Sequence, residues 1–140
     1  MWLRPPIWTT PVAALVLLVA AHAEEASPIQ VSRHTTAGRE VRLGTEVSWD
    51  AQCQRLRTPQ VQVVGPPSSG TISLRPASKV VEGNLVGTTS CTGMRFEGVG
   101  IYYAPQPDFE GSDQVLYDVR FPNGSTLHFV AHVEVRPPKR

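Results

Sequence analysis

The 140-residue sequence has few of the features that mark enzymes or nucleic-acid-binding proteins. Thirteen basic and twelve acidic residues leave a net charge of +1, which argues against a nucleic-acid footprint or a polybasic membrane patch. No long stretch carries apolar residues at helical spacing, which argues against a helical fold. Gly-x-Ser-x-Gly, Ser-x-x-Lys and phosphate-binding glycine loops are absent. We therefore predict a protein that is not an enzyme and that uses no cofactor.

An apolar run from Pro11 to Ala20 lies near the start of the chain, after a single charge at Arg4. The run has the length of a signal-peptide core and is shorter than the roughly 20 residues that span a bilayer. Ala21-His22-Ala23 then fits a small-x-small cleavage motif. We predict a signal peptide over residues 1–23, with cleavage near Ala23, and a periplasmic or secreted mature chain without a stable membrane span. An uncleaved membrane anchor is the alternative.

Only two cysteines occur, Cys53 and Cys91, so a single pairing exists. An exported chain meets an oxidising environment, in which a disulfide is the default. A redox or metal-binding pair is the alternative, although neither cysteine belongs to a Cys-x-x-Cys motif. We predict a structural disulfide. We expect Trp49 to pack in the core near it rather than to form a sugar-stacking platform.

Short alternating runs separated by turn residues follow the leader, a pattern typical of β-sandwiches and barrels. The predicted strands cover residues 29–34, 40–43, 46–49, 60–64, 71–75, 100–104, 114–121 and 125–135. Residues 76–98 are the least regular, and we predict a long excursion there that the disulfide holds down. Residues 24–135 then form one β-sandwich domain, and residues 136–140 form a disordered tail.

The last two predicted strands can be aligned through their apolar residues, which should face the core. A two-residue Asn-Gly turn would set every core residue opposite a solvent-facing one. A three-residue loop over Pro122–Gly124 instead pairs apolar residues with each other, and its proline and glycine suit a type I turn followed by a left-handed residue. The predicted pairs are Val119 with Leu127, Tyr117 with Phe129, and Val115 with Ala131.

The segment that follows Tyr102 contains Tyr-x-Pro-x-x-x-Phe-x-Gly-Ser-Asp-x-Val-x-Tyr-x-Val. It resembles the closing motif of bacterial extracellular immunoglobulin-like and cadherin-like modules of the tandem-repeat type. Upstream, Val64–Leu74 resembles the strand-turn-strand of the same family, so the likeness covers roughly Glu40 to Val135. Residues 76–98 form an insertion relative to the family. The Asp-rich turn that is usual in the family is absent from this sequence. The motif positions carried over are Tyr103, Pro105, Phe109, Gly111, Asp113 and Tyr117.

The resemblance implies an all-β fold, an antiparallel two-sheet immunoglobulin-like β-sandwich. Phe109 would close one end, Gly111 would permit a tight turn, and Asp113 or Ser112 would accept N–H bonds at that turn. Such modules usually act as spacers, adhesion units or appendages of larger surface proteins.

We therefore expect an exported, non-enzymatic module with a structural, adhesion or protein-binding role at the cell envelope. Its partner would be an envelope or extracellular protein, bound through loops or by addition of a strand to a sheet edge. Residues 76–98 are the segment expected to carry recognition. A carbohydrate-binding module, or a periplasmic enzyme inhibitor using the 76–98 loop, is the alternative.

Two sets of polar side chains suggest metal sites that their spacing does not support. His128 and His132 share a strand face about 13 Å apart, too far to chelate one ion. Asp108, Glu110 and Asp113 offer oxygen ligands for Ca²⁺ but lack the density of a calcium-binding turn. We predict no metal site. A calcium site near Asp108–Asp113, or a histidine site completed by a ligand from a neighbouring strand, is the alternative.

Overall fold

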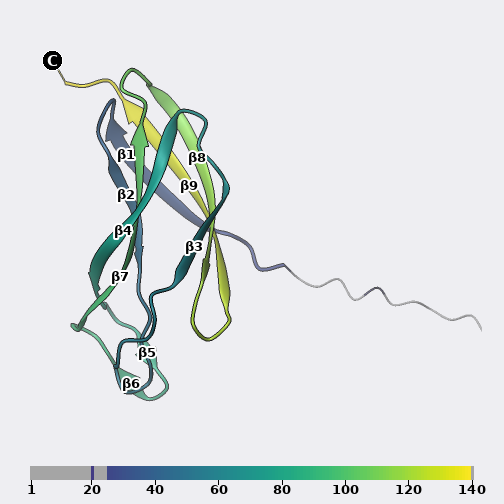
Figure 1. The fold of residues 1–140 in the computed structure, drawn as a ribbon, viewed down its shortest axis with the longest axis vertical. Helices are drawn as coiled ribbons and strands as arrows, with labels where there is room; N and C mark the ends of the chain where they lie inside the picture. Colours follow the sequence, from purple (N-terminus) through teal and green to yellow (C-terminus); the bar gives the residue numbers. More distant parts are fainter. Residues whose placement is uncertain (1–19, 21–24, 140) are drawn as a thin grey trace, which may run out of the picture.

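The computed structural model describes residues 20 and 25–139, and every regular element within that part of the chain is a β-strand (Figure 1). The signal peptide and cleavage site predicted over residues 1–23 lie outside the described residues, apart from Ala20. Across the ranges 20 and 25–139, no helix has the length and hydrophobicity to cross a bilayer.

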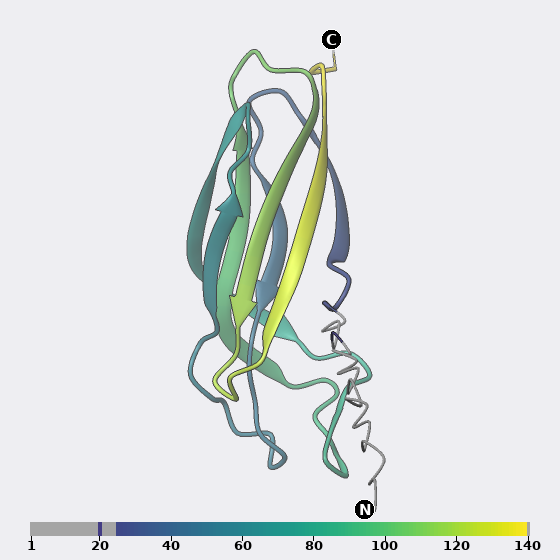
Figure 2. The same cartoon turned by 90° about the vertical axis from the view of Figure 1, so that its right-hand side faces the viewer.

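The strands form two larger sheets that lie as two layers (Figures 1 and 2). In strand order, the four-stranded sheet consists of β1 (Ile29–Thr36), β9 (Thr126–Arg136), β8 (Gly111–Arg120) and β3 (Gln60–Gly65). The three-stranded sheet consists of β2 (Val41–Glu46), β7 (Arg95–Pro105) and β4 (Gly70–Val80). Between β4 and β7, β5 (Leu85–Val86) and β6 (Thr89–Ser90) form a small separate hairpin.

The core forms where the inner faces of the two sheets meet. Period-two alternation sends every second side chain of β8 and β9 inward. Full burial of a large apolar side chain stabilises the fold by roughly 1.5–3 kcal/mol, so this cluster holds the layers together. Its buried members are Leu43, Ile101, Tyr103, Val115, Tyr117, Val119, Phe129, Ala131, Val133 and Val135.

The register predicted for the last hairpin is confirmed: Tyr117 lies opposite Phe129, and the pairs on either side follow. The Gly124 N–H donates to the Phe121 carbonyl, and Gly124 has a φ of 87°. Leu127 was predicted to be buried, but 40% of it is exposed. It lies at the start of β9 beside the loop, where a hairpin end has few neighbours to cover it.

The antiparallel arrangement predicted for the sheets is wrong for one pair, since β1 runs parallel to β9. These strands come from opposite ends of the domain, so no short turn forces them to be antiparallel. The two strands predicted at 40–43 and 46–49 are also wrong. One strand, β2, replaces them, with a register shift between Arg42 and Gly44, and Trp49 forms only an isolated bridge with Arg55.

The excursion predicted over residues 76–98 is shorter than expected. β4 continues to Val80 and β7 begins at Arg95, and the two strands pair in register along their whole length. Pro76 lies within β4, which is an edge strand, where a missing N–H is tolerated. Only residues 81–94 lie outside the ladder.

Substitution of Gly124 tests the hairpin loop. We expect Gly124→Val to lower the free energy of unfolding by about 1–3 kcal/mol, because a β-branched residue is strained at positive φ. Gly124→Asn should cost less, since asparagine visits this conformation more readily. Urea unfolding measures both variants, and equal stability of the valine variant and the parent would contradict the loop.

Candidate functional site

Several of the motif residues meet around one carboxylate, that of Asp113. Its Oδ1 accepts the N–H groups of Ser68 and Gln114 at 3.0 and 2.8 Å. Its Oδ2 accepts the Ser69 N–H at 2.9 Å and the Tyr103 hydroxyl at 2.8 Å. Asp113 is only 7% exposed. The carboxylate therefore ties β7 and β8 to the turn between β3 and β4.

This role differs in part from the prediction, which placed the Asp113 bonds at its own turn. The donors Ser68 and Ser69 are more than 40 residues away in sequence. Burial alone would raise the pKa of Asp113, but these N–H groups and the Tyr103 hydroxyl stabilise the charged form and hold its pKa below the usual range. Burial and the bond to Asp113 raise the pKa of Tyr103 well above its usual range.

The other motif residues also have structural contacts. Pro105 is buried at the end of β7, and Phe109 packs half-buried against the core. Gly111 has a φ of 130°, which favours glycine. The ring of Tyr117 stacks on that of Phe129 at 5.0 Å. These contacts account for the motif without any reactive chemistry.

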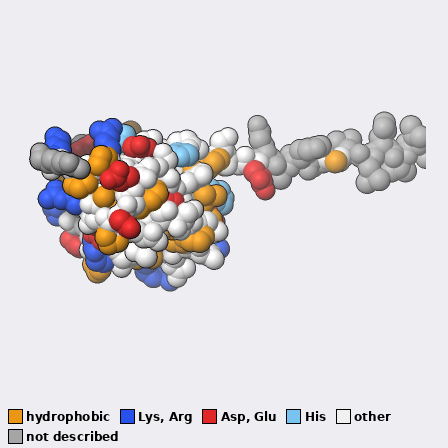
Figure 3. All heavy atoms as spheres, turned by 90° about the horizontal axis from the view of Figure 1, so that it is seen from above, with side chains coloured by type: hydrophobic (Ala, Val, Ile, Leu, Met, Phe, Trp, Pro, Cys, Tyr) orange, Lys and Arg blue, Asp and Glu red, His pale blue; other side chains and the backbone are white. Residues whose placement is uncertain are grey.

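The acidic residues near the motif are not gathered into a calcium site. Asp108 and Glu110 are exposed, whereas Asp113 is buried and both of its oxygens already accept hydrogen bonds. Within residues 20 and 25–139, no group of three His, Cys, Asp or Glu side chains is placed to hold a metal ion. Figure 3 shows the molecule from above this end, where acidic, basic and apolar side chains are interspersed.

His128 and His132 lie on the exposed face of the four-stranded sheet. The Nδ1 atom of His128 lies 2.7 Å from Asp118 Oδ1, and the Nε2 atom of His132 lies 2.9 Å from Gln30 Oε1. Each histidine thus contacts a different neighbouring strand. The two side chains have separate partners and form no common site.

The predicted disulfide is confirmed: Cys53 and Cys91 are bonded, with Cα atoms 5.6 Å apart. It joins residues 47–59 to residues 81–94, and we call these two segments the disulfide lobe. Around Cys91 lies a second buried cluster, separate from the main core, which includes Phe96. Trp49 stacks on Phe96 at 5.3 Å, so it packs beside the disulfide as predicted. Figure 1 shows the lobe below the two sheets, around β5 and β6.

The disulfide lobe carries exposed apolar side chains, one in its hairpin and one next to β7. Leu85, in the β5–β6 hairpin, is 69% exposed, and Met94 is 43% exposed. The lobe's tryptophan, by contrast, is stacked on another ring. Aliphatic exposure of this kind suits a protein contact better than a sugar, which needs open aromatic rings.

Sequence reasoning did not identify β3 as an unprotected edge of the four-stranded sheet. Its residues, Gln-Val-Gln-Val-Val-Gly, include neither a charged residue nor a proline. Charges and prolines are the usual means by which proteins block an edge from pairing with another chain. The other edge strands of the two larger sheets all carry them: Arg33 in β1, Arg42 and Glu46 in β2, and Arg75, Pro76 and Lys79 in β4.

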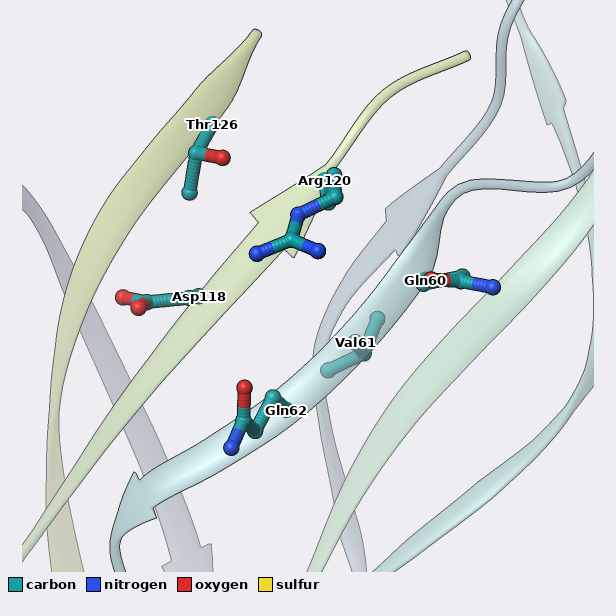
Figure 4. A pocket seen from close by; sticks show the side chains of 6 residues that line it. All are labelled: Gln60, Val61, Gln62, Asp118, Arg120 and Thr126. Atoms are coloured by element: carbon teal, nitrogen blue, oxygen red, sulfur yellow. The ribbon is translucent and has the colours of Figure 1, made fainter. Parts of the chain in front are cut away.

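The exposed side chains next to β3 form a shallow polar hollow of about 410 Å³ (Figure 4). Gln60 and Gln62 contribute from β3, and Arg120 contributes from β8. Farther along the same strands, Val64 is 52% exposed and Leu116 is 38% exposed. The exposed surface along β3 and β8 is therefore polar near Gln60 and apolar near Val64.

A second polar feature lies between the sheets, near β1 and β2. A Cβ atom at Gly44 would lie 3.3 Å from Glu46 Oε1 and 3.8 Å from the Tyr117 hydroxyl, so both groups border the same space. Burial raises the pKa of Glu46, and the charge of Lys79 offsets this only in part. Burial, together with the Glu46 charge, raises the pKa of Tyr117 to about 12.

Comparison with known proteins adds no identity. A scan against protein-family models gave no match, and a search of curated proteins gave none either. These comparisons therefore add nothing to the sequence resemblance to immunoglobulin-like and cadherin-like modules.

Removal of the disulfide should destabilise the fold strongly. Cys53 and Cys91 are 38 residues apart in sequence. Loop-closure entropy predicts that replacing both with serine lowers the free energy of unfolding by about 4 kcal/mol. Reduction of the parent by dithiothreitol should lower its free energy of unfolding by a similar amount, and both changes should lower the melting temperature. An unchanged melting temperature in both cases would rule out a structural role.

Asp113→Asn should lower the free energy of unfolding by about 3 kcal/mol at neutral pH, since charge-assisted bonds are lost within a buried site. The pKa of Asp113 is lower in the folded than in the unfolded state. The ionised Asp113 carboxylate therefore contributes fully to the free energy of unfolding above the unfolded-state pKa. This contribution is lost as the pH falls through the folded-state pKa. The difference between parent and variant should shrink toward pH 2. Asp108→Asn, at an exposed position, is the control and should change the stability little. If the stability difference between the parent and Asp113→Asn did not depend on pH, the role assigned to the Asp113 carboxylate would be refuted.

Glu46→Gln should raise the melting temperature at pH 7, because the fold disfavours the charged form of this half-buried carboxyl. A raised folded pKa means that the parent gains stability as the pH falls, so the gain of the variant should vanish in acid. Glu82→Gln, at an exposed position, should change little. Loss of stability in Glu46→Gln at pH 7 would instead show that the carboxylate has a favourable partner.

Proposed function

We propose that this chain is an exported, non-enzymatic immunoglobulin-like module that binds another protein at the cell envelope by accepting a strand at the free edge of β3. The observation that carries the proposal is that β3, alone among the edge strands of the two larger sheets, has neither charge nor proline. Strand addition supplies affinity through main-chain hydrogen bonds, and side-chain pockets supply specificity.

The strand order supports an immunoglobulin-like sandwich. The order β2-β7-β4 corresponds to strands B, E and D of such folds, and β9-β8-β3 corresponds to strands G, F and C. The small β5–β6 hairpin is then an insertion, and β1 flanks β9. The disulfide departs from the antibody pattern, in which the bond crosses between strands B and F. Here it closes the disulfide lobe instead.

The edge of β3 is available for pairing. Its backbone bonds lie on the side of β8, and across the described residues no other segment forms a backbone bond with β3. The inward residues Val61 and Val63 pack against the core, which fixes the strand in place. A rigid edge reduces the ordering cost of binding. Each main-chain bond formed would contribute about 1 kcal/mol net.

The disulfide lobe supports a second candidate mode, contact through its tip. Leu85, at 69% exposed, is the most exposed of the large apolar side chains in the described part of the chain. A partner with an apolar pocket would bind it without using β3. Leu85→Asp separates this mode from strand addition.

Two proline variants test strand addition. Successive N–H groups of a strand point to opposite edges of that strand. Of the N–H groups of residues 62 and 63, one therefore faces β8 and the other faces the free edge. Gln62→Pro and Val63→Pro each remove one of these two N–H groups. The variant that keeps the parent's melting temperature identifies the outward N–H. The parent should retain clones from a phage library of random peptides, and that variant should lose them.

Leu85→Asp is the matched control and should retain the same clones. If clones were retained by the proline variant but lost by Leu85→Asp, the peptides would bind the disulfide lobe and not β3. No retained clone at all would overturn the proposal of strand addition.

A further inference from the structure

We infer that the strand accepted by β3 is the carboxyl-terminal segment of its partner, and that Arg57 and Arg120 bind its terminal carboxylate. The inference rests on the proposed strand addition and names the chemistry of the partner. It starts from a pair of guanidinium groups at one end of the unprotected edge.

Arg57 and Arg120 are both exposed and line one hollow of about 290 Å³, together with Gln60. Arg120 lies directly opposite Gln60 in the ladder of β3 and β8. Within residues 20 and 25–139, neither guanidinium has an ion-pair or hydrogen-bond partner in the protein. Two unpaired cations that share one hollow favour an anion there.

The nearest carboxylate does not neutralise this pair. Asp118 lies 2.7 Å from the Nδ1 atom of His128 and forms no ion pair with Arg120. Figure 4 shows the Asp118 side chain directed toward β9, away from the Arg120 guanidinium. The field at the start of β3 therefore remains positive.

Strand direction places a carboxyl terminus at this position. An added strand pairs somewhat better in the antiparallel sense, as β3 itself does with β8. Since β3 runs from Gln60 to Gly65, an antiparallel partner strand ends beside Gln60. Its last residue then lies beside Gln60, close to Arg57, which precedes β3 directly in the chain. Arg120 lies on the opposite side of β3, two strand spacings or about 10 Å away, a distance that a long arginine side chain can bridge.

The walls of the hollow favour a chain end over an internal acidic residue. Arg57 and Thr58 border it on the side of the disulfide lobe, and Pro122 and Gly124 border it on the side of the β8–β9 loop. A partner chain that continued past Gln60 would meet the segment of Arg57 and Thr58, which leads from the disulfide lobe into β3. A terminal carboxylate can instead accept paired bonds from a guanidinium.

The same geometry predicts which type of residue the partner carries before its carboxyl terminus. Gln60, Gln62 and Val64 are the exposed residues of β3, so every second residue of the partner faces the same side. Val64 lies about 13 Å beyond Gln60 along the strand. The residue four positions before the partner's terminus would therefore lie near the exposed Val64 and Leu116, and an apolar side chain fits there.

The test uses a phage library of random heptapeptides with free carboxyl termini, selected on the mature chain that follows cleavage near Ala23. Selected peptides are synthesised as acids and as amides, and fluorescence anisotropy measures their affinities. We expect the acid to bind at least tenfold more tightly than the amide. Arg57→Gln and Arg120→Gln should each reduce this ratio, and the double variant should abolish it. Arg39→Gln with Arg42→Gln is the control of equal charge loss and should preserve the ratio.

The outcomes separate the two proposals. Acid and amide binding equally, with both lost in the outward proline variant of β3, would overturn the carboxylate inference and keep strand addition. Peptides that bind the proline variant as well as the parent, or a library that yields no binder, would overturn both. Selected sequences without an apolar residue at the fourth position before the terminus would refute the contact with Val64.

Discussion

Two sheets that face each other without closing into a barrel leave edge strands, and each edge presents unpaired backbone groups. The apolar contact between the layers commits one face of each sheet to the core, and the strand order fixes which strands become edges. Charged residues or a proline occupy the edge strands β1, β2 and β4. The interaction surface proposed for this protein follows from the single edge, β3, that lacks them.

The rest of the molecule keeps that edge in place. Asp113 holds the turn that leads from β3 into β4, through the N–H groups of Ser68 and Ser69. At the other end, the disulfide lobe precedes β3 directly in the chain, and the bond from Cys53 to Cys91 restrains it. The buried, hydrogen-bonded carboxylate of Asp113 thus restrains β3 at one end, and the disulfide restrains it at the other. A stiff strand is already in the conformation that an added strand requires.

Local patterns predicted much of this structure, and long-range pairing accounts for what they missed. The register around Tyr117 and Phe129 was predictable because a short loop with a glycine at positive φ leaves few alternatives. The disulfide was predictable because only one pairing existed. The parallel neighbour of β1 and the distant donors of Asp113 were not, since residues about 45 to 100 positions apart meet there. The status of β3 as an edge likewise depends on the complete strand order, and the alternation of Val61 and Val63 is the same in an edge strand as in a central one.

The most direct test of the central claim is amide hydrogen exchange of the chain with and without a selected peptide bound. Strand addition predicts that the outward N–H groups between Gln60 and Val64 exchange more slowly in the complex, while those of residues 81–94 are unchanged. Slower exchange confined to residues 81–94, with β3 unaffected, would contradict the account.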